Sequence, residues 1–304
     1  MQLHRWPRSS WLEFAFNFQS AAWHSAFSRS KSASQQAIIN DKLAFEELLL
    51  ANNLRSITTL RAVGAGESIT TRELQVLPDK VFFKPRVGNQ SRGCFVVRRT
   101  SKAKQMNLQI AWFKDKIVND DQTLDILNKI IRNHDYLMQP LLKNHPDFVL
   151  LFDTDELVTI RLVTVKPEAK SIAISALIEI PIVDQPNYYW NMLIDVDSGA
   201  FMKPLNFPGQ DNELNKGFRK LAAHAQGKVC PYWEDIKKLC ADAHELFDQM
   251  FTIGWDVALS TDGPVIVEGN GNWSLAHYQI LKREPMLKLP LGKVYARILD
   301  APDR

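Results

Sequence analysis

Few cysteines, no long apolar run and little net charge limit what this chain can be. Its 304 residues include only three cysteines, Cys94, Cys230 and Cys240, which are odd in number and widely spaced. This usage fits a reducing compartment and argues against a disulfide framework or a structural zinc site. No apolar run approaches the roughly 20 residues of a membrane-spanning helix, and no secretory signal pattern opens the chain. We therefore expect a cytoplasmic protein.

The 37 basic and 34 acidic residues nearly balance, so charge indicates neither a nucleic-acid nor a membrane partner. The length suits two lobes around a shared cleft. Helical segments mixed with mostly antiparallel strands predict an α+β protein. We expect an N-terminal lobe at residues 37–138 and a C-terminal lobe at residues 139–304, which meet near Gln139.

Residues 1–36 form a basic, aromatic-rich arm with three of the eight tryptophans and one acidic residue, Glu13. Trp11, Phe14 and Phe18 recur at helical spacing. This pattern favours a helix that packs on the body of the protein or on a second subunit. A helix at a membrane surface and a transit peptide stay open, so a membrane-peripheral location does too.

Apolar periodicity and turn residues predict the regular elements of the chain. Helices are expected at residues 40–53, 122–132 and 232–250, the first capped by Asn40 or Asp41. Strands or extended segments are expected at residues 58–63, 80–85, 94–99, 136–142, 148–152, 156–165, 171–180, 191–199, 254–260 and 264–268.

The last predicted hairpin brings two carboxylates together. A three-residue loop at residues 261–263 would place Asp256 directly opposite Glu268, with Asn270 on the same face. Facing carboxylates repel unless a cation lies between them, and two carboxylates with an amide suit magnesium. A two-residue loop would instead shift the register by one and separate the carboxylates onto opposite faces. Alternatively, Asp256 faces solvent and GNGN is only a flexible turn.

The segment KPRVGNQSRG begins with Lys84 at the end of a predicted strand. A lysine followed by a small, polar, glycine-bounded loop presents cationic and N–H groups to phosphates. The loop lacks the GK[ST] of a Walker A sequence, and alone it would also suit a surface hairpin with a solvated lysine. Together with the acidic trio, it indicates a magnesium–nucleotide site.

These segments resemble the ATP-grasp superfamily, most closely its sugar-transfer-associated branch, which is related to alpha-L-glutamate ligases. The resemblance runs from about residue 40 to about residue 279 and leaves out the arm. The combination IGWDVA…GPVIVEGN is highly specific, and VTIRLVT supports it. The resemblance implies an ATP-grasp fold, in which two α+β lobes with mostly antiparallel sheets sandwich the nucleotide.

The resemblance also implies roles for the matching residues. Lys84 and the backbone from Gly88 to Gly93 would hold the phosphates of ATP. Lys42 would be the second phosphate-facing lysine, although a solvated lysine in the first turn of a helix would also explain it. Arg161 would stabilise charge at the γ-phosphate and the acyl-phosphate transition state, although a cross-strand ion pair would also explain an arginine there. The remaining implied positions are Gln139, Pro140 and Leu141 beside adenine, Asp147 at the ribose, and Asp256, Glu268 and Asn270 as ligands of one or two Mg²⁺ (or Mn²⁺) ions.

One departure from the family pattern concerns the acceptor. The metal strand commonly continues into a proline-containing segment, whereas here it continues as EGNGNWSLAHYQ. We therefore expect the surface just beyond the trio, where acceptors would bind, to differ. Trp273 and His277 there are candidate acceptor contacts, although both would also suit residues without a role in binding.

The usual chemistry of the superfamily implies a ligase for small-molecule substrates. ATP phosphorylates a carboxylate, and an amine then displaces the acyl phosphate. The absence of a GxSxG nucleophile motif agrees with this chemistry. Polysaccharide or cell-envelope biosynthesis is the expected setting. Two alternatives share the nucleotide site: a kinase for a sugar-type hydroxyl, and a non-catalytic nucleotide-binding accessory protein.

Overall fold

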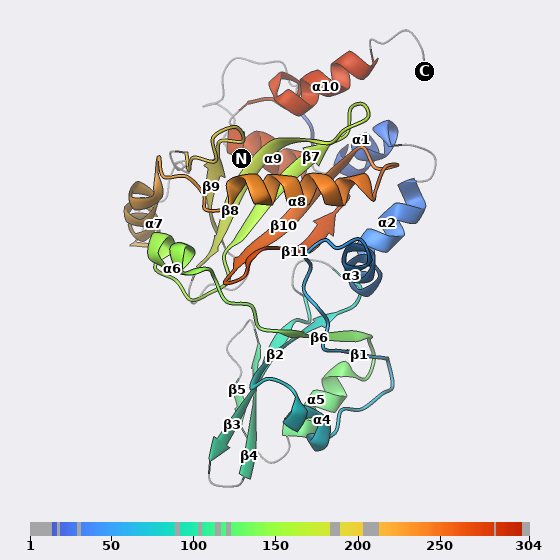
Figure 1. Ribbon diagram of the computed structural model, residues 1–304, viewed down its shortest axis with the longest axis vertical. Helices are drawn as coiled ribbons and strands as arrows, with labels where there is room; N and C mark the ends of the chain where they lie inside the picture. Colours follow the sequence, from blue (N-terminus) through green and yellow to red (C-terminus); the bar gives the residue numbers. More distant parts are fainter. Residues whose placement is uncertain are drawn as a thin grey trace.

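Two antiparallel sheets, one above the other in Figure 1, organise the chain into a larger and a smaller lobe. The computed structural model describes residues 14–16, 19–28, 32–88, 92–102, 105–112, 117–119, 123–182, 189–202, 213–282 and 284–299. Every pairing between its named strands is antiparallel, as the sequence predicts. Among these residues, no helix is both long and apolar enough to cross a bilayer.

The smaller lobe is a six-stranded sheet in the order β1-β6-β2-β3-β4-β5. Helices α4 (Thr71–Val76) and α5 (Thr123–Ile131) pack on one face of it through an apolar cluster that includes Leu127 and Phe83. The strands are β1 (Arg61–Val63), β2 (Lys80–Pro85), β3 (Phe95–Lys102), β4 (Gln105–Trp112), β5 (Ile117–Asn119) and β6 (Tyr136–Pro140).

The pairing of β2 with β6 determines which side chains point away from this apolar cluster. Phe83 pairs with Met138, and both lie in the apolar cluster under the helices. Phe82 pairs with Gln139 and Lys84 with Leu137. Because alternate residues of a strand point to opposite faces, Lys84 and Gln139 project from the face that α4 and α5 leave uncovered.

The larger lobe is a five-stranded sheet in the order β11-β10-β7-β8-β9. Helix α8 (Trp233–Glu245) crosses one face of it, with α3 (Lys42–Ala51), α6 (Pro146–Phe152) and α7 (Glu213–Ala225) around it (Figure 1). The strands are β7 (Thr159–Val165), β8 (Ile172–Pro181), β9 (Tyr189–Ile194), β10 (Thr252–Ser260) and β11 (Gly263–Asn270).

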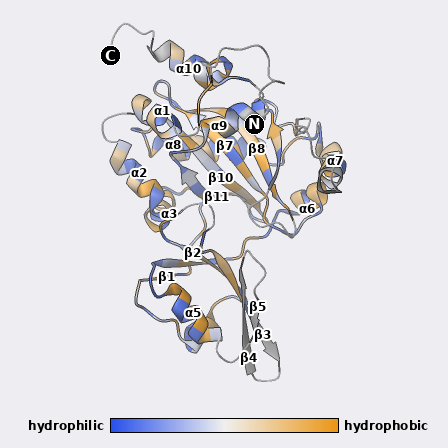
Figure 2. Cartoon of the chain, turned by 180° about the vertical axis from the view of Figure 1, so that it is seen from behind, coloured by the Kyte–Doolittle hydropathy of each residue, from blue (hydrophilic) through white to orange (hydrophobic). Residues whose placement is uncertain are grey.

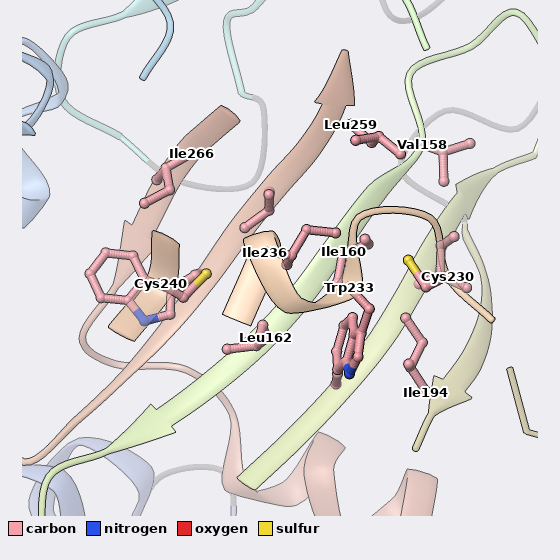
Figure 3. Packing of buried hydrophobic residues seen from close by; sticks show 14 of the residues in the cluster. Val158, Ile160, Leu162, Ile194, Cys230, Trp233, Ile236, Cys240, Leu259 and Ile266 are labelled. Atoms are coloured by element: carbon pink, nitrogen blue, oxygen red, sulfur yellow. The ribbon is translucent and has the colours of Figure 1, made fainter. Parts of the chain in front are cut away.

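The main core lies between α8 and this sheet. Ile236 and Cys240 of α8 and Ile160 and Leu162 of β7 are fully buried and belong to one cluster (Figure 3). Strands of this lobe accordingly include strongly hydrophobic segments (Figure 2). Burying one such aliphatic side chain contributes about 1.5–3 kcal/mol, so this face of the sheet serves packing.

Helix α3 packs on the larger sheet, since its Phe45 and Leu49 belong to that core. It begins after Asp41, whose carboxylate accepts hydrogen bonds from the backbone N–H groups of Leu43 and Ala44, so the predicted cap is confirmed. Helix α2 (Ser32–Asn40) precedes it. The predicted boundary between the lobes at residues 138 and 139 stays a prediction.

The described part of the arm packs against the body of the protein. Helix α1 (Ser20–Phe27) lies against α9 (Leu275–Lys282) and α10 (Pro290–Leu299), near the short 3₁₀ helix Met286–Lys288 (Figure 1). Phe27 stacks on Tyr295, with ring centroids 4.2 Å apart. Of the three aromatic residues in the predicted helical repeat, Trp11 and Phe18 fall outside the described residues.

One predicted strand is wrong. Residues 148–152 belong to helix α6, not to a strand. His145 caps this helix, Pro146 begins it and Asp147 lies in its first turn. These are helix-start signals, and they outweigh the short apolar run that suggested a strand, whose Leu150 is exposed.

Candidate active site

The two carboxylates of the last hairpin are paired, but by a different route from the one predicted. Ser260 pairs with Gly263 across a two-residue turn, so the predicted three-residue loop is wrong. A register shift between Asp256 and Val257 then gives β11 one extra residue. This β-bulge cancels the effect of the shorter turn, and Asp256 still pairs directly with Glu268.

Asp256 is the centre of a polar cluster on the face of the sheet opposite α8. Its neighbour across β7 is Arg161, whose Nε and Nη2 both donate to the Asp256 carboxylate, Nη2 at 3.0 Å from Oδ2. Asn270 Nδ2 donates to the same Oδ2 at 3.2 Å. The cross-strand ion pair considered for Arg161 is therefore present, and it lies beside the candidate metal ligands.

The donor set of this cluster fits a magnesium ion. Burial and the nearby Asp256 carboxylate raise the pKa of Glu268, although nearby Lys42, Lys84 and Arg161 oppose the shift. Asn270 uses its NH₂ group on Asp256, which leaves its amide oxygen for a ligand. No group of three His, Cys, Asp or Glu side chains within the described ranges forms a metal site. Two carboxylates and an amide nevertheless suffice for Mg²⁺, which takes its remaining ligands from water and phosphate.

Two lysines approach Glu268 from α3 and β2. Lys42 Nζ lies 4.0 Å from Glu268 Oε1 and donates to the carbonyl oxygen of Gly88 at 2.6 Å. Lys84 is only 6% exposed. Burial lowers its pKa to about 8, against the opposing effect of Glu268, and Lys42 lowers it further. Two adjacent cations, one of them desolvated, favour an anionic ligand such as phosphate.

The start of the glycine loop is fixed to helix α3. Arg86 Nε and Nη2 donate to the two carboxylate oxygens of Asp41 at 2.8 and 2.7 Å, and Lys42 N–H donates to the Arg86 carbonyl oxygen at 3.1 Å. Gly88 and Gly93 both have positive φ, at 137° and 78°, a conformation that favours glycine. Residues 89–91, between them, lie outside the described part. The sequence analysis did not identify Arg86, which couples the loop to the helix that carries Lys42.

The residues predicted to lie beside adenine are at the end of β6 and just after it. Gln139 is 2% exposed, and its Nε2 donates to Glu46 Oε2 at 3.2 Å and to Thr59 Oγ1 at 3.1 Å. Its Oε1 is buried with no hydrogen-bond partner among the described residues. Pro140 ends the strand, and Leu141 is partly exposed beside it. These positions remain a prediction for the adenine side.

No hydrogen bond or ion pair joins Asp147 to the other candidate residues among the described ones. Asp147 sits in the first turn of α6, its side chain is half exposed, and its carboxylate lies 3.5 Å from His145 Nδ1. The next residue, Phe148, packs into the core on the α8 side of the sheet. The ribose contact therefore remains a prediction that no observed contact to the other site residues supports.

Trp273, one of the two expected acceptor contacts, is a buried structural residue. Its indole N–H donates to Thr252 Oγ1 at 3.2 Å, and its carbonyl oxygen accepts from His24 Nε2 at 3.0 Å. The side chain of His277 lies outside the described part. The segment that follows β11 is thus held by helix α1 of the N-terminal arm.

Sequence reasoning missed the carboxylate of Glu179 on β8. Glu179 lies beside Arg161 and near Asp256. Burial raises the pKa of Glu179 to about 6, against the opposing effect of Arg161. Burial disfavours the charged form of Arg161, but Asp256 and Glu179 outweigh this effect and raise its pKa. The signal in the sequence was an ionisable residue inside an apolar strand, the same signal that marked Arg161.

The family of the chain follows from its sequence. Residues 24–294 match the family described as sugar-transfer associated ATP-grasp. The chain belongs to this family, and its two antiparallel sheets with helices form an α+β, ATP-grasp fold. A comparison with curated proteins finds no match.

Solved structures with a similar fold include ligases of low sequence identity. D-alanine–D-alanine ligase from Bacillus anthracis, complexed with ATP, aligns with a TM-score of 0.49 and 11% identity over 89% of this chain and 69% of that one. For the ATP-grasp ligase PsnB the values are 0.45, 12%, 90% and 63%. For N5-carboxyaminoimidazole synthetase from Staphylococcus aureus, complexed with ADP, they are 0.45, 10%, 84% and 52%. The chain thus spans about half to two thirds of their lengths, and similarity at this level does not identify a reaction.

Proposed function

We propose that this chain is an Mg²⁺- and ATP-dependent ligase that joins a carboxylate to an amine through an acyl phosphate. The observation that carries the proposal is the meeting of Lys42 and Lys84 with Glu268, beside the Arg161–Asp256 pair. Cations and acidic groups from both sheets and from α3 come together at this point. Membership of the ATP-grasp family supports ATP as the nucleotide.

In this proposal the cationic residues contact the phosphates, and the carboxylates with the amide hold the metal ion. Lys42 and Lys84 bind the triphosphate together with backbone N–H groups of the loop from Gly88 to Gly93. Asp256, Glu268 and Asn270 would hold Mg²⁺, which neutralises phosphate charge when bound. Arg161 faces the γ-phosphate, where its fixed guanidinium stabilises the charge that develops during transfer.

The reaction has two displacement steps. A carboxylate oxygen of the substrate attacks the γ-phosphorus of ATP, the bond to the β-phosphate oxygen breaks, and ADP leaves. The nitrogen of a neutral amine then attacks the carbonyl carbon, the bond from that carbon to the phosphate oxygen breaks, and phosphate leaves while the nitrogen loses its proton to water. Catalysis in such transfers is mostly positioning and charge stabilisation, which agrees with a site built from cations and carboxylates.

The setting is a finer part of the proposal. The family is described as sugar-transfer associated, and we therefore assign the reaction to polysaccharide or cell-envelope biosynthesis, in the cytoplasm where ATP is available. The substrates would be small molecules. This description itself names neither the carboxylate nor the amine.

The test is ADP release from ATP and Mg²⁺ in the presence of panels of carboxylates and amines. Ligase activity requires both substrates and disappears in Glu268→Ala, whereas Glu168→Ala, at an exposed carboxylate of the same lobe, keeps it. A stable phosphorylated sugar would establish the kinase alternative instead. Nucleotide binding without turnover in any panel would establish the accessory protein.

A further inference from the structure

A row of polar residues crosses the larger sheet next to the Arg161–Asp256 pair. Thr159 on β7 pairs with Glu179 on β8, and Glu179 pairs with Asn191 on β9. Thr159 lies two residues from Arg161 on the same strand, so the row shares the face of the candidate site and lies about 7 Å along the sheet from it.

The acceptor atoms of this row are not satisfied. Asn191 Oδ1 is buried and has no hydrogen-bond partner within the described ranges, while its Nδ2 donates to the Tyr189 carbonyl oxygen at 3.1 Å. Glu179 accepts one long contact, from Thr159 Oγ1 at 3.5 Å. Buried polar groups in native proteins are nearly always hydrogen-bonded, so the row offers acceptor oxygens to a ligand that brings hydrogen-bond donors.

The charges near the row indicate the charge of the ligand that would donate these hydrogen bonds. The Arg161 guanidinium is engaged bidentately by Asp256, and Lys42 lies next to Glu268. Among the described residues, Glu179 has no ion-pair partner within 4.0 Å. The nearby Arg161 attracts Glu179 but is hydrogen-bonded to Asp256, so the Glu179 carboxylate is only partly compensated and favours a positively charged ligand.

The neighbours of the row supply surface for the rest of such a ligand. Leu177 and Leu193 form a separate buried pair on this face, directly beyond Arg161 in the pairing of the strands. Tyr189 is 38% exposed at the start of β9 and lies near both Glu179 and Asp256. The row thus has an apolar wall on one side and a phenol on the other.

We propose that Thr159, Glu179 and Asn191 form the subsite for the amine acceptor, which binds as a primary ammonium group. The inference rests on the proposed ligase function and specifies its second substrate. An ammonium donates three hydrogen bonds, and its positive charge would give Glu179 the direct ion pair that it does not form with Arg161. Its position beside Arg161 places the nitrogen next to the site where the acyl phosphate forms, and the group loses one proton to water before it attacks.

The experiment is calorimetric titration of the full chain with matched probes, in the presence and absence of a non-hydrolysable ATP analogue and Mg²⁺. Glucosamine is compared with glucose, and L-alaninamide with L-lactamide, so that each pair differs by an amine in place of a hydroxyl. We expect at least one amine to bind tenfold or more tightly than its hydroxyl partner. Glu179→Gln should abolish this preference, and Glu168→Gln should retain it.

A second variant tests the same idea in the opposite direction. Asn191→Asp adds negative charge to the row and should strengthen amine binding several-fold, with circular dichroism confirming that each variant is folded. Equal affinity for amine and hydroxyl probes, or a preference that survives Glu179→Gln, overturns the subsite. Failure of the ATP analogue to bind instead contradicts the proposed function, and the titrations without nucleotide still decide the subsite.

Discussion

The buried histidine of the N-terminal arm should make the stability of the whole protein depend on pH. His24 on α1 is 3% exposed, and its Nε2 donates to the Trp273 carbonyl oxygen at 3.0 Å. A carbonyl oxygen only accepts, so Nδ1 is the acceptor for the Tyr295 hydroxyl at 3.1 Å. Burial lowers the pKa of His24 from 6.5 to about 4, although the hydrogen bond to Trp273 opposes this shift.

The sign and size of the effect follow from proton linkage. Between about pH 6.5 and pH 4, the unfolded chain binds a proton at this position and the folded protein does not. The stability contributed by neutral His24 is therefore complete above pH 6.5 and is lost as the pH falls. From pH 7 to pH 4.5 the loss is about 2.5 kcal/mol.

The assay is urea unfolding of wild type and His24→Gln at several pH values between 7 and 4.5. The variant loses hydrogen bonds and is expected to be less stable by about 1–3 kcal/mol at pH 7. This gap should close by about 2.5 kcal/mol at pH 4.5, because glutamine does not titrate. His134→Gln, at an exposed histidine, provides the baseline. A gap between wild type and His24→Gln that stays constant with pH would refute the reasoning.

Three further predictions concern the candidate site. Lys84→Met should weaken ATP–Mg²⁺ binding at least tenfold in calorimetry, because a charge-assisted hydrogen bond is worth about 1.5–3 kcal/mol. The melting temperature should not fall, because the buried ammonium is costly in the free protein. An ATP affinity within twofold of wild type contradicts the prediction. Arg161→Leu should cost about 3 kcal/mol in denaturant unfolding by leaving Asp256 unpaired, and Asp256→Leu in the same chain should restore part of that loss; strictly additive losses contradict the pairing. Arg86→Lys keeps the charge but loses the bidentate contact to Asp41, so the KM for ATP should rise several-fold; an unchanged KM would show that the loop does not depend on this contact.

Much of the fold could be predicted because helix caps and apolar patterns in the sequence coincide with the residues that are buried in the structure. Helix α3 has both a cap and an apolar stripe, and most of the core strands carry uninterrupted apolar runs. Helix α6 was mistaken for a strand because a run of five apolar residues fits either element, and only the cap residues before it distinguish the two.

The individual residues of the candidate site could be recognised in the sequence, but contacts that depend on strand register or on distant segments could not. Asp256 and Glu268 were found as a pair, yet the bulge that pairs them leaves no mark in the sequence. Glu179 and Asn191 become neighbours only through the register of β8 with β9. Arg86 forms its contact with Asp41 across 45 residues of chain, which no local pattern can indicate.

The extra residue in β11 makes the facing of Asp256 and Glu268 independent of the length of the hairpin turn. In a regular ladder, lengthening or shortening the tip by one amino acid would turn Glu268 away from Asp256. Here the kink near the acids absorbs that difference. The tip at residues 261 and 262 is thereby free to vary in length over evolution, provided that the kink appears or disappears in compensation while the two acids stay face to face.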